Sequence, residues 1–335
     1  MKGMCNTVNV RRNCIMAKER TRSKHEIDML ELKRAKRRRA IKENATLYLF
    51  MLPGIVLLFL FCYRPMYGIL IAFQDYLPGK PIIGEGVRWV GLKHIKGFMS
   101  SYYFRRLIRN TLVLSVMNLI FVFPVPIIFA LVINEIIWPR TKKVIQTITY
   151  LPHFISTVVV AGMVTSFLAD DGIITLLLKT FGLHVSSMNT NASAFPWIYT
   201  FIKVWQSFGW GSILYLSTMS SIDPGLYEAA EIDGASRLKR IRHITLPALM
   251  PLIMIQLILF IGSILGNDSN LILLLYSPAT YETADVIGTY TYREGLLGGQ
   301  FSSGTAIGLF MSIIGFILTF ISNKISDKTT GFALW

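Results

Sequence analysis

The sequence predicts an all-α polytopic membrane protein with six transmembrane helices. Of its 335 residues, 53% are hydrophobic and only 16% are charged, which gives a positive mean hydropathy of +0.50. Six apolar stretches are long enough to cross a bilayer, which takes about 20 helical residues. Most Lys and Arg residues fall in segments that these crossings would place on one side of the membrane. This composition excludes an ordinary cytosolic enzyme, a disordered chain and a secreted disulfide scaffold.

The first 46 residues form a basic tail. Residues 1–46 hold 14 of the 34 Lys and Arg residues, five Asp and Glu residues, and no aromatic residue. We expect the tail to set topology and to contact anionic lipid headgroups, whereas nucleic-acid binding would call for aromatic residues among the basic ones. Cys5 and Cys14 in the tail, together with Cys62, show no Cys-x-x-Cys spacing. Neither a zinc site nor a disulfide framework is therefore expected.

Six apolar stretches follow the tail and are expected to be the transmembrane helices. The first is interrupted only by Arg64 and Pro65, and the second carries no charge. In the third only His153 can titrate, and without a His or carboxylate partner it does not suggest a metal site. The fourth contains Lys203 near its start. The stretches are residues 47–73, 110–134, 144–169, 196–217, 246–267 and 304–323.

The distribution of basic residues predicts the orientation. If the amino terminus is cytoplasmic, the inner segments carry 23 of the 34 Lys and Arg residues, and six crossings leave both termini in the cytoplasm. The outer loop at 74–109 is an exception, with seven basic residues against Asp75 and Glu85. Two explanations stay open: the loop attracts an acidic partner or an anionic sugar such as a uronate oligomer, or it pairs with four acids at 268–294.

The segment at 222–247, between the fourth and fifth stretches, is the most informative part of the sequence. Asp223 is a good N-cap and Pro224 suits the first position of a helix. Gly234 is expected to end this short helix. A second short helix should follow, closed by the Leu246-Pro247 pair that opens the fifth span. The alternative is a solvated amphipathic loop on the membrane surface.

This segment closely resembles the EAA motif of type I ABC-importer permeases. In that motif Glu-Ala-Ala is followed by Asp-Gly-Ala and, about ten residues later, by Ile-x-Leu-Pro. A departure is Ile241, where the family more often has Phe, although an apolar residue is kept. The matching positions are Glu228, Ala229, Ala230, Asp233, Gly234, Ala235, Ile244, Leu246 and Pro247.

The resemblance extends over about residues 45–325. Further stretches at 65–76, 109–112, 204–206 and 281–295 look like the subfamily of carbohydrate-uptake permeases that handle oligosaccharides derived from polysaccharides. The resemblance implies a maltose-permease-like transmembrane domain that imports an oligosaccharide across the bacterial cytoplasmic (inner) membrane. It divides the chain into a cytoplasmic tail, the first helix, an outer loop, a core domain that includes the 222–247 loop, and a C-terminal tail. These parts are 1–46, 47–73, 74–109, 110–323 and 324–335.

The resemblance also implies how the chain is driven. Glu228 would accept a charge-assisted hydrogen bond from a separate ATPase subunit, beside Tyr227. Ala229 and Ala230 would allow close approach, and Gly234 would permit the turn. This chain is expected to be no enzyme and to bind no cofactor, because it lacks Gly-x-x-x-x-Gly-Lys-Ser/Thr; ATP and Mg²⁺ would be bound by the ATPase. The implied partners are a second homologous permease, a dimeric ATPase, an extracytoplasmic solute-binding protein and the lipid bilayer, with no nucleic acid.

Polar and aromatic residues inside the apolar stretches are candidates for the substrate path, because sugars stack on aromatic faces and bind through paired donors and acceptors. These candidates are Asn118, Trp205, Gln206 and Gln256. Each can equally serve as an interhelical hydrogen bond that holds two spans together. A rival function, an ion-coupled secondary sugar transporter, would call for intramembrane carboxylates and an inverted repeat. Neither is evident in the sequence.

Overall fold

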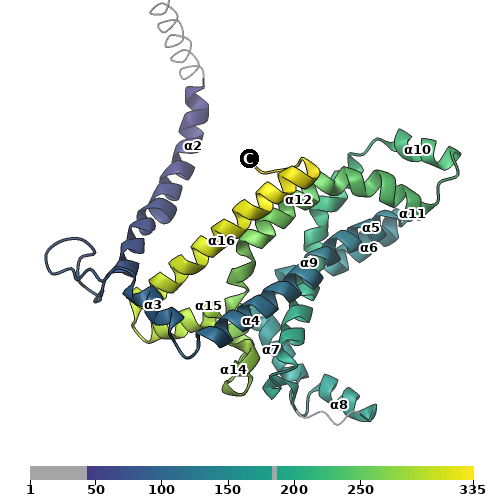
Figure 1. Cartoon of the computed structure of the whole chain (residues 1–335). Coiled ribbons are helices and arrows are strands. Elements are labelled where there is room, and N and C mark those ends of the chain that lie inside the picture. Colours follow the sequence, from purple (N-terminus) through teal and green to yellow (C-terminus); the bar gives the residue numbers. More distant parts are fainter. Residues whose placement is uncertain (1–43, 183–186) are drawn as a thin grey trace, which may run out of the picture. The chain divides into compact units, whose positions relative to one another are not determined.

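The computed structural model describes residues 44–182 and 187–335. Within these ranges the chain is helical, and the only sheet-like pairing is an isolated bridge between Gln74 and Trp89. The prediction of an all-α fold is therefore confirmed (Figure 1). The basic tail up to residue 43, with Cys5 and Cys14, lies outside the described residues. The remainder divides into two compact units that meet between Tyr67 and Gly68.

The first unit contains helix α2, Ala45–Leu58, which continues through a π turn at Phe59–Tyr63. A 3₁₀ segment, Arg64–Phe73, follows and leads into the second unit. A π turn widens the helix just before Pro65, whose missing N–H and ring disrupt regular α-helical hydrogen bonding. Together these segments form a 29-residue stretch that is long and apolar enough to span a membrane. None of the residues of α2 is buried.

The second span begins earlier than the sequence predicts. Helix α4, Phe104–Met117, passes through a π turn at Asn118–Val122 into α5, Pro124–Asn134. These form one 31-residue stretch, about 46 Å long at 1.5 Å per residue. The helix is thus longer than the hydrocarbon core of roughly 30 Å. Its first residues, Phe104–Arg109, precede the predicted start at Asn110.

The third apolar stretch is not one continuous helix, contrary to the sequence prediction for 144–169. Helix α6, Pro139–Tyr150, and a 3₁₀ turn at Leu151–Phe154 are bent by 97° from helix α7, Thr157–Phe167. Pro152 supplies no N–H to continue α6, and the Ser156 hydroxyl caps α7 by accepting a 3.3 Å hydrogen bond from Val159 N. Helix α8, Ile173–Thr180, follows.

The fourth predicted span is helix α9, Phe195–Ser220. Its 26 residues are enough to cross a bilayer, but its many Trp, Tyr, Ser and Gly residues make it less apolar than the other long helices. It packs closely on α6, because Gly209 lies directly against the backbone of Thr149. The six-span prediction is compatible with four long apolar helices, the bent α6–α7 pair and α9.

The last two spans are helices α12, Leu246–Ser263, and α16, Phe301–Thr330. Gly262 on α12 touches Thr319 on α16, which indicates close helix packing. Helix α16 runs beyond the predicted end at residue 323 and stops at Gly331, whose φ is +72°. The Asn323 side chain accepts a hydrogen bond from Leu334 N (2.7 Å). Part of the predicted C-terminal tail is therefore helix, and the rest folds back along it.

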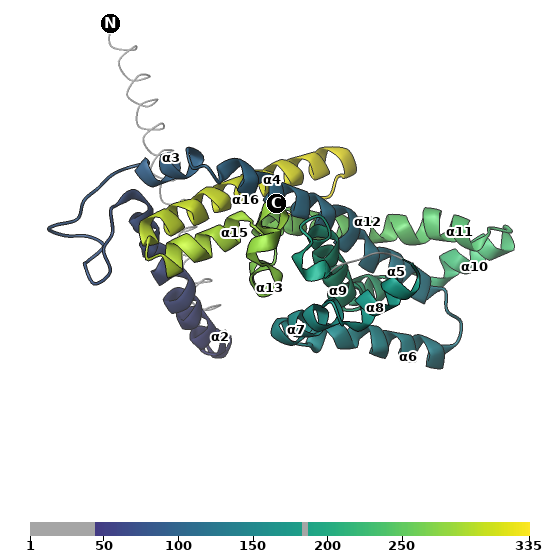
Figure 2. The same cartoon turned by 90° about the horizontal axis from the view of Figure 1, so that it is seen from below.

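The second unit has two distinct ends. One end carries α3, Lys93–Met99, the start of α4, and α15, Ile287–Tyr290, which share a buried cluster around Phe98 and Leu107. The opposite end carries α10, Pro224–Ile232, and α11, Arg237–Arg240, as both views show (Figures 1 and 2). Between the ends, α5, α9 and α12 share a second cluster. The short helices α13, Ser269–Leu275, and α14, Tyr281–Ala284, connect α12 to α15.

Candidate functional site

The segment 222–247 folds into the predicted short helix with the predicted start. The Asp223 side chain caps α10 by accepting a 2.9 Å hydrogen bond from Gly225 N, and Pro224 occupies the first turn. The first N–H groups of a helix have no partner within the helix. The Asp223 side chain satisfies one of them, and Pro224 has no N–H to leave unpaired. The helix is nine residues long.

Gly234 ends α10 as the sequence predicts. Ala235 N donates to Ala230 O (2.9 Å) and Gly234 N donates to Glu231 O (3.0 Å), the hydrogen bonds of a Schellman motif. Gly234 has φ +72°, a conformation that costs other residues about 1–2 kcal/mol. A Cβ atom there would meet nothing within 4 Å. The glycine is therefore required by backbone conformation and not by space.

The second short helix does not stand alone, which corrects the sequence prediction. Helix α11 passes through a π turn at Ile241–Thr245 directly into α12, so that 237–266 is one 30-residue helical stretch. The Leu246-Pro247 pair does not close a helix. The π turn widens the helix just ahead of Pro247, which lacks an N–H, and the helical path continues. Helix α11 is thus continuous with the fifth span, and no loop at Pro247 separates the two.

Two side-chain contacts tie α10 to this long helix. The Tyr227 hydroxyl and the Thr245 hydroxyl are 2.9 Å apart, and Thr245 is buried. Arg240 Nη1 lies 3.1 Å from Glu231 Oε2. Because both contacts bridge the Gly234 turn, α10 is held at a set angle to the span.

The remaining motif residues divide by exposure. Glu228, Ala229, Asp233, Gly234 and Pro247 are exposed, whereas Ala230, Ala235, Ile244 and Leu246 are partly buried. Within the described chain the Glu228 carboxylate has no partner. Three apolar side chains of the same segment are strongly exposed: Leu226 and Ile232 on α10 (53% and 87%) and Leu238 on α11 (75%). Exposed apolar residues around a free carboxylate are typical of a protein-binding surface.

One of the substrate-path candidates lines a polar cavity inside the bundle. Asn118 Nδ2 donates to Asn267 Oδ1 (3.1 Å), which joins the α4–α5 helix to the end of α12. Such a bond is the structural role that the sequence left open, but Asn118 also faces a cavity of about 480 Å³. The cavity is lined further by Tyr199, Lys203, Asp268, Asn270 and other residues of α9 and α13. Amides, hydroxyls and charges of this kind suit sugar hydroxyl groups.

The other three candidates are not gathered in this cavity. Gln256 lines a second cavity of about 370 Å³ that shares Val122, Phe260 and Ser263 with the first. Trp205 instead lines a separate apolar cavity with residues of α7 and α8. Gln206 is partly buried and lines none of these three cavities. Asn118 and Gln256 therefore line two neighbouring cavities, whereas Trp205 and Gln206 line neither of them.

Sequence reasoning missed an ion pair in the cavity that Asn118 faces. Lys203 Nζ on α9 lies 3.0 Å from Asp268 Oδ2, directly after the fifth span. Asp268 Oδ1 also caps α13 by accepting from Leu271 N (3.2 Å). The preceding Asn267 has φ +41°, the only positive value among the described residues other than glycine. The sequence did hold a signal for this ion pair, namely Lys203 inside an apolar stretch, because a charge within the membrane needs a partner.

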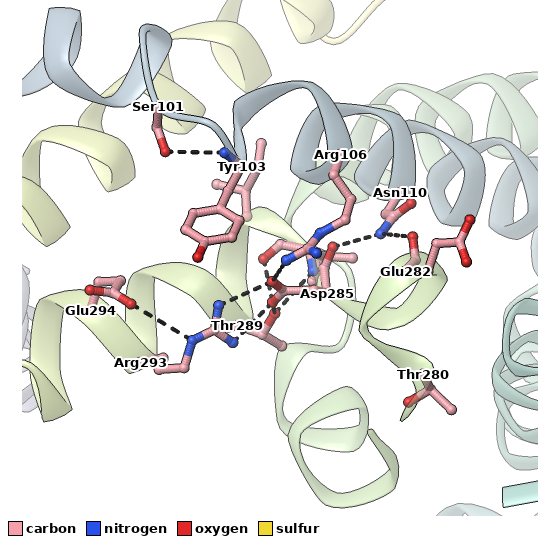
Figure 3. A network of polar contacts seen from close by, with 12 residues as sticks. Ser101, Tyr103, Arg106, Asn110, Thr280, Glu282, Asp285, Thr289, Arg293 and Glu294 are labelled. Carbon is pink, nitrogen blue, oxygen red and sulfur yellow. Dashed lines mark hydrogen bonds and ion pairs between the residues drawn. The ribbon is translucent and has the colours of Figure 1, made fainter. Parts of the chain in front are cut away.

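At the opposite end of the unit, a buried carboxylate joins two arginines (Figure 3). Asp285 is fully buried and accepts hydrogen bonds from Arg106 Nη2 (3.0 Å) on α4 and from both terminal nitrogens of Arg293 (3.1 and 3.0 Å). Thr289 Oγ1 donates to the same carboxylate (2.9 Å). Burial alone would lower the pKa of Arg293, but the hydrogen bonds and the charge of Asp285 raise it above its ordinary value.

These contacts explain part of the basic outer loop. Arg109 Nη2 donates to the Glu282 carbonyl oxygen (2.8 Å), so the loop contacts the acidic 268–294 segment as one of the two sequence interpretations expected. Within the loop, Lys93 lies 3.0 Å from Asp75. The hydrogen bond from Lys93 lowers the pKa of Asp75 despite partial desolvation, with help from His94 and Arg88. Pairing with an acid of this segment thus accounts for Arg106, whereas Arg109 meets the segment only through a backbone oxygen.

The amino-acid sequence matches a family model described as the binding-protein-dependent transport system inner membrane component, over residues 95–331. Two similar relatives are from Bacillus subtilis (strain 168). The polygalacturonan/rhamnogalacturonan transport system permease protein YteP is 41% identical over 306 residues, covering 90% of this chain and 95% of the relative. Protein LplB is 40% identical over 291 residues, covering 86% and 91%.

Two solved structures match the fold. One is a bacterial ABC transporter involved in the import of the acidic polysaccharide alginate, with a TM-score of 0.79 and 41% identity over 87% of this chain and 98% of that chain. The other is the bacterial alginate ABC transporter in complex with an alginate pentasaccharide-bound periplasmic protein, with a TM-score of 0.80 and 40% identity over 88% and 99%. The predicted resemblance and fold are confirmed. This membrane-spanning chain belongs to the family of binding-protein-dependent transport system inner membrane components and is a permease subunit of an ABC importer.

Proposed function

We propose that this chain forms, with a second permease subunit, the path by which an ATP-driven importer carries an acidic oligosaccharide into the cell. A separate ATPase would bind ATP and Mg²⁺, and an extracytoplasmic binding protein would deliver the sugar. The observation that carries the proposal is the match, at about 40% identity over nearly the whole chain, to permeases of acidic-polysaccharide systems. Of the three polysaccharides named, polygalacturonan and alginate are chains of uronic acids, and rhamnogalacturonan contains galacturonic acid next to rhamnose.

The geometry of the 222–247 segment supports the part played by the ATPase. Glu228 and the exposed Leu226 and Ile232 offer a charge-assisted bond and an apolar contact to a partner. Because α11 continues into α12 as one helix, a displacement of α10 acts directly on a span. We infer that ATP-driven movement of the partner shifts the bundle between two arrangements as a rigid-body transition. Both termini and this segment then lie on the cytoplasmic side.

The polar cavity beside Asn118 supports a sugar path through the bundle. It offers amide groups from Asn118 and Asn270 and a Lys203–Asp268 pair to a passing ligand. A uronate carboxylate can compete with Asp268 for Lys203, while hydroxyl groups bind the amides. Gln256 would extend the path into the neighbouring cavity.

Uptake into proteoliposomes tests the proposal. The full complex of two permeases, ATPase and binding protein is reconstituted, and uptake of a labelled oligogalacturonate and an oligomer of alginate is measured with and without ATP. Uptake of a uronate oligomer that requires ATP, ATPase and binding protein is expected. Uptake by the permeases alone, driven by an imposed proton or sodium gradient, would instead support the ion-coupled alternative. ATP-dependent uptake restricted to neutral oligosaccharides would contradict the acidic substrate.

A further inference from the structure

An open cavity at the start of α4 is not part of either site described above. It has a volume of about 400 Å³ and lies at the end of the unit opposite α10. We call it the arginine–tyrosine cavity. It is lined by Tyr102, Tyr103, Arg105, Arg106, Arg109 and Glu282.

The charges of this cavity are unbalanced toward the positive. Three guanidinium groups and one carboxylate line it. Arg106 is engaged with the buried Asp285, and Arg109 donates to the backbone oxygen of Glu282 and not to its carboxylate. Arg105 is exposed and has no hydrogen bond or ion pair within the described ranges 44–182 and 187–335. The cavity therefore keeps binding capacity for an anion.

Two tyrosine rings frame the same cavity. Tyr102 is 91% exposed, and its ring meets the ring of Tyr103 edge to face with 5.5 Å between centroids. The guanidinium of Arg106 lies 5.2 Å from the centre of the Tyr103 ring. The exposed Tyr102 lies beside Arg105, which has no partner among the described residues, and Arg109, which contacts only neutral oxygens. This arrangement suits a ligand with both a flat ring face and carboxylates. A uronate sugar has both features.

The base of the cavity is rigid. Asn110 Nδ2 donates to the carbonyl oxygens of Glu282 and Asp285, each at 2.9 Å, and Leu107 on the same helix is fully buried. Arg105 and Arg109 lie four residues apart on α4, so they are on the same face of the helix, with about 5–6 Å between their Cβ atoms. The helix that carries both arginines is thus fixed, and the Arg109 guanidinium, already held by Asn110 Oδ1 and Glu282 O, loses less freedom when it binds a carboxylate.

We propose that the arginine–tyrosine cavity receives the carboxylates of an acidic oligosaccharide as it leaves the binding protein, with Arg105 and Arg109 binding carboxylate groups and Tyr102 stacking on a sugar ring. This inference rests on the proposed function and adds a receiving site at the outer end of the path. The concave shape favours a sugar over an acidic protein surface, because about 400 Å³ accommodates a small ligand.

Uptake by charge-removal variants of the complete complex tests the site. Arg105→Gln/Arg109→Gln is compared with Arg88→Gln/Lys96→Gln, which removes two exposed outer cations that do not line the cavity. With limiting loaded binding protein, uronate uptake should fall at least about tenfold in the first variant, as expected for a lost charge-assisted contact, and less than about twofold in the second. Equal effects of the two variants would overturn the inference.

Cross-linking identifies what the cavity touches. A photoreactive p-benzoylphenylalanine replaces Tyr102 in the complete complex, which is irradiated during turnover with a labelled uronate oligomer. Attachment of the sugar supports the site; attachment of the binding protein alone, or of nothing, overturns it. If the unaltered complex imports no uronate oligomer, the proposed function fails. If it imports one while the cavity variants match their control, only this inference fails.

Discussion

Replacing Asp285 tests the network at the end of the unit opposite α10. In the Asp285→Asn variant the side chain keeps its shape but loses its charge and half of its acceptors. The native carboxylate is fully buried and accepts four hydrogen bonds, three of them from Arg106 and Arg293. The variant leaves two guanidinium groups near each other without their buried counterion, and only the more exposed Glu294, 3.8 Å from Arg293 Nε, remains nearby.

The expected cost is about 3 kcal/mol of the free energy of unfolding. Removing one partner of a buried ion pair typically costs roughly 3–5 kcal/mol. The lower end applies here, because the side chains of Arg106 and Arg293 keep 30% and 26% exposure and retain some water. At about 2 °C per kcal/mol for a chain of this size, the midpoint of thermal unfolding should fall by about 6 °C.

The measurement is thermal unfolding of the purified permease in detergent, with Glu294→Gln as the matched control. Glu294 is 36% exposed and lies 3.8 Å from Arg293 Nε, so its removal should cost less than about 1 kcal/mol. Arg106→Gln in the Asp285→Asn background should recover part of the loss, since it removes one unpaired charge. An Asp285→Asn midpoint equal to that of Glu294→Gln would refute the reasoning.

Three further predictions follow from particular contacts. Gly209→Ala would place a Cβ 2.1 Å from the Thr149 carbonyl oxygen and should lower the unfolding midpoint by the equivalent of about 1–3 kcal/mol, whereas Gly162→Ala, with open space, should not. Because the pKa of Asp75 is lowered, its contact with Lys93 stabilises the loop at neutral pH and is lost as pH falls below about 4. Amide hydrogen exchange of residues 74–91, corrected for intrinsic rates, should therefore rise at low pH. Exchange that does not depend on pH, or an equal rise in Asp75→Asn, would contradict this stabilising role. Asp268→Ala should unfold more easily than Asp268→Asn by about 1 kcal/mol, because Asn still caps α13; equal midpoints would contradict the capping role.

Hydropathy and local signals were sufficient for much of the fold. Long apolar stretches predict spanning helices because backbone groups in lipid have no other partner. The start of α10 at Pro224 and its end before Gly234 also follow from local chemistry, since capping and positive φ depend on neighbouring residues. The motif residues around Glu228, by contrast, were identified from the resemblance to the EAA motif and not from local chemistry.

Whether a helix bends or continues at a proline was harder to predict. Composition does not report a bend, so the 97° break between α6 and α7 was missed although Pro152 lies there. Conversely, Pro247 was expected to interrupt a helix, and a π turn carries the helix through it. A proline marks a disturbance of hydrogen bonding, but tertiary packing decides whether the helix bends or continues.

Pairings between distant residues could not be predicted from one sequence. Lys203 and Asp268 are separated by 65 positions and Arg106 and Asp285 by 179, so no local pattern connects them. The sequence left open whether Asn118 serves substrate or packing, and the structure places it in both a hydrogen bond and a cavity wall. Trp205 was offered as a path residue on composition alone and lies in a different, apolar cavity.

The most direct test of the account is the ATPase activity of the reconstituted complex in response to loaded binding protein. Glu228→Arg and Gly234→Pro should abolish this stimulation while membrane insertion and permease pairing persist, because one reverses the charge offered to the ATPase and the other forbids φ +72°. Gly234→Ala, which meets no neighbour, should keep part of it. Full stimulation in both Glu228→Arg and Gly234→Pro would contradict the claim that an ATPase moves this bundle through the 222–247 segment.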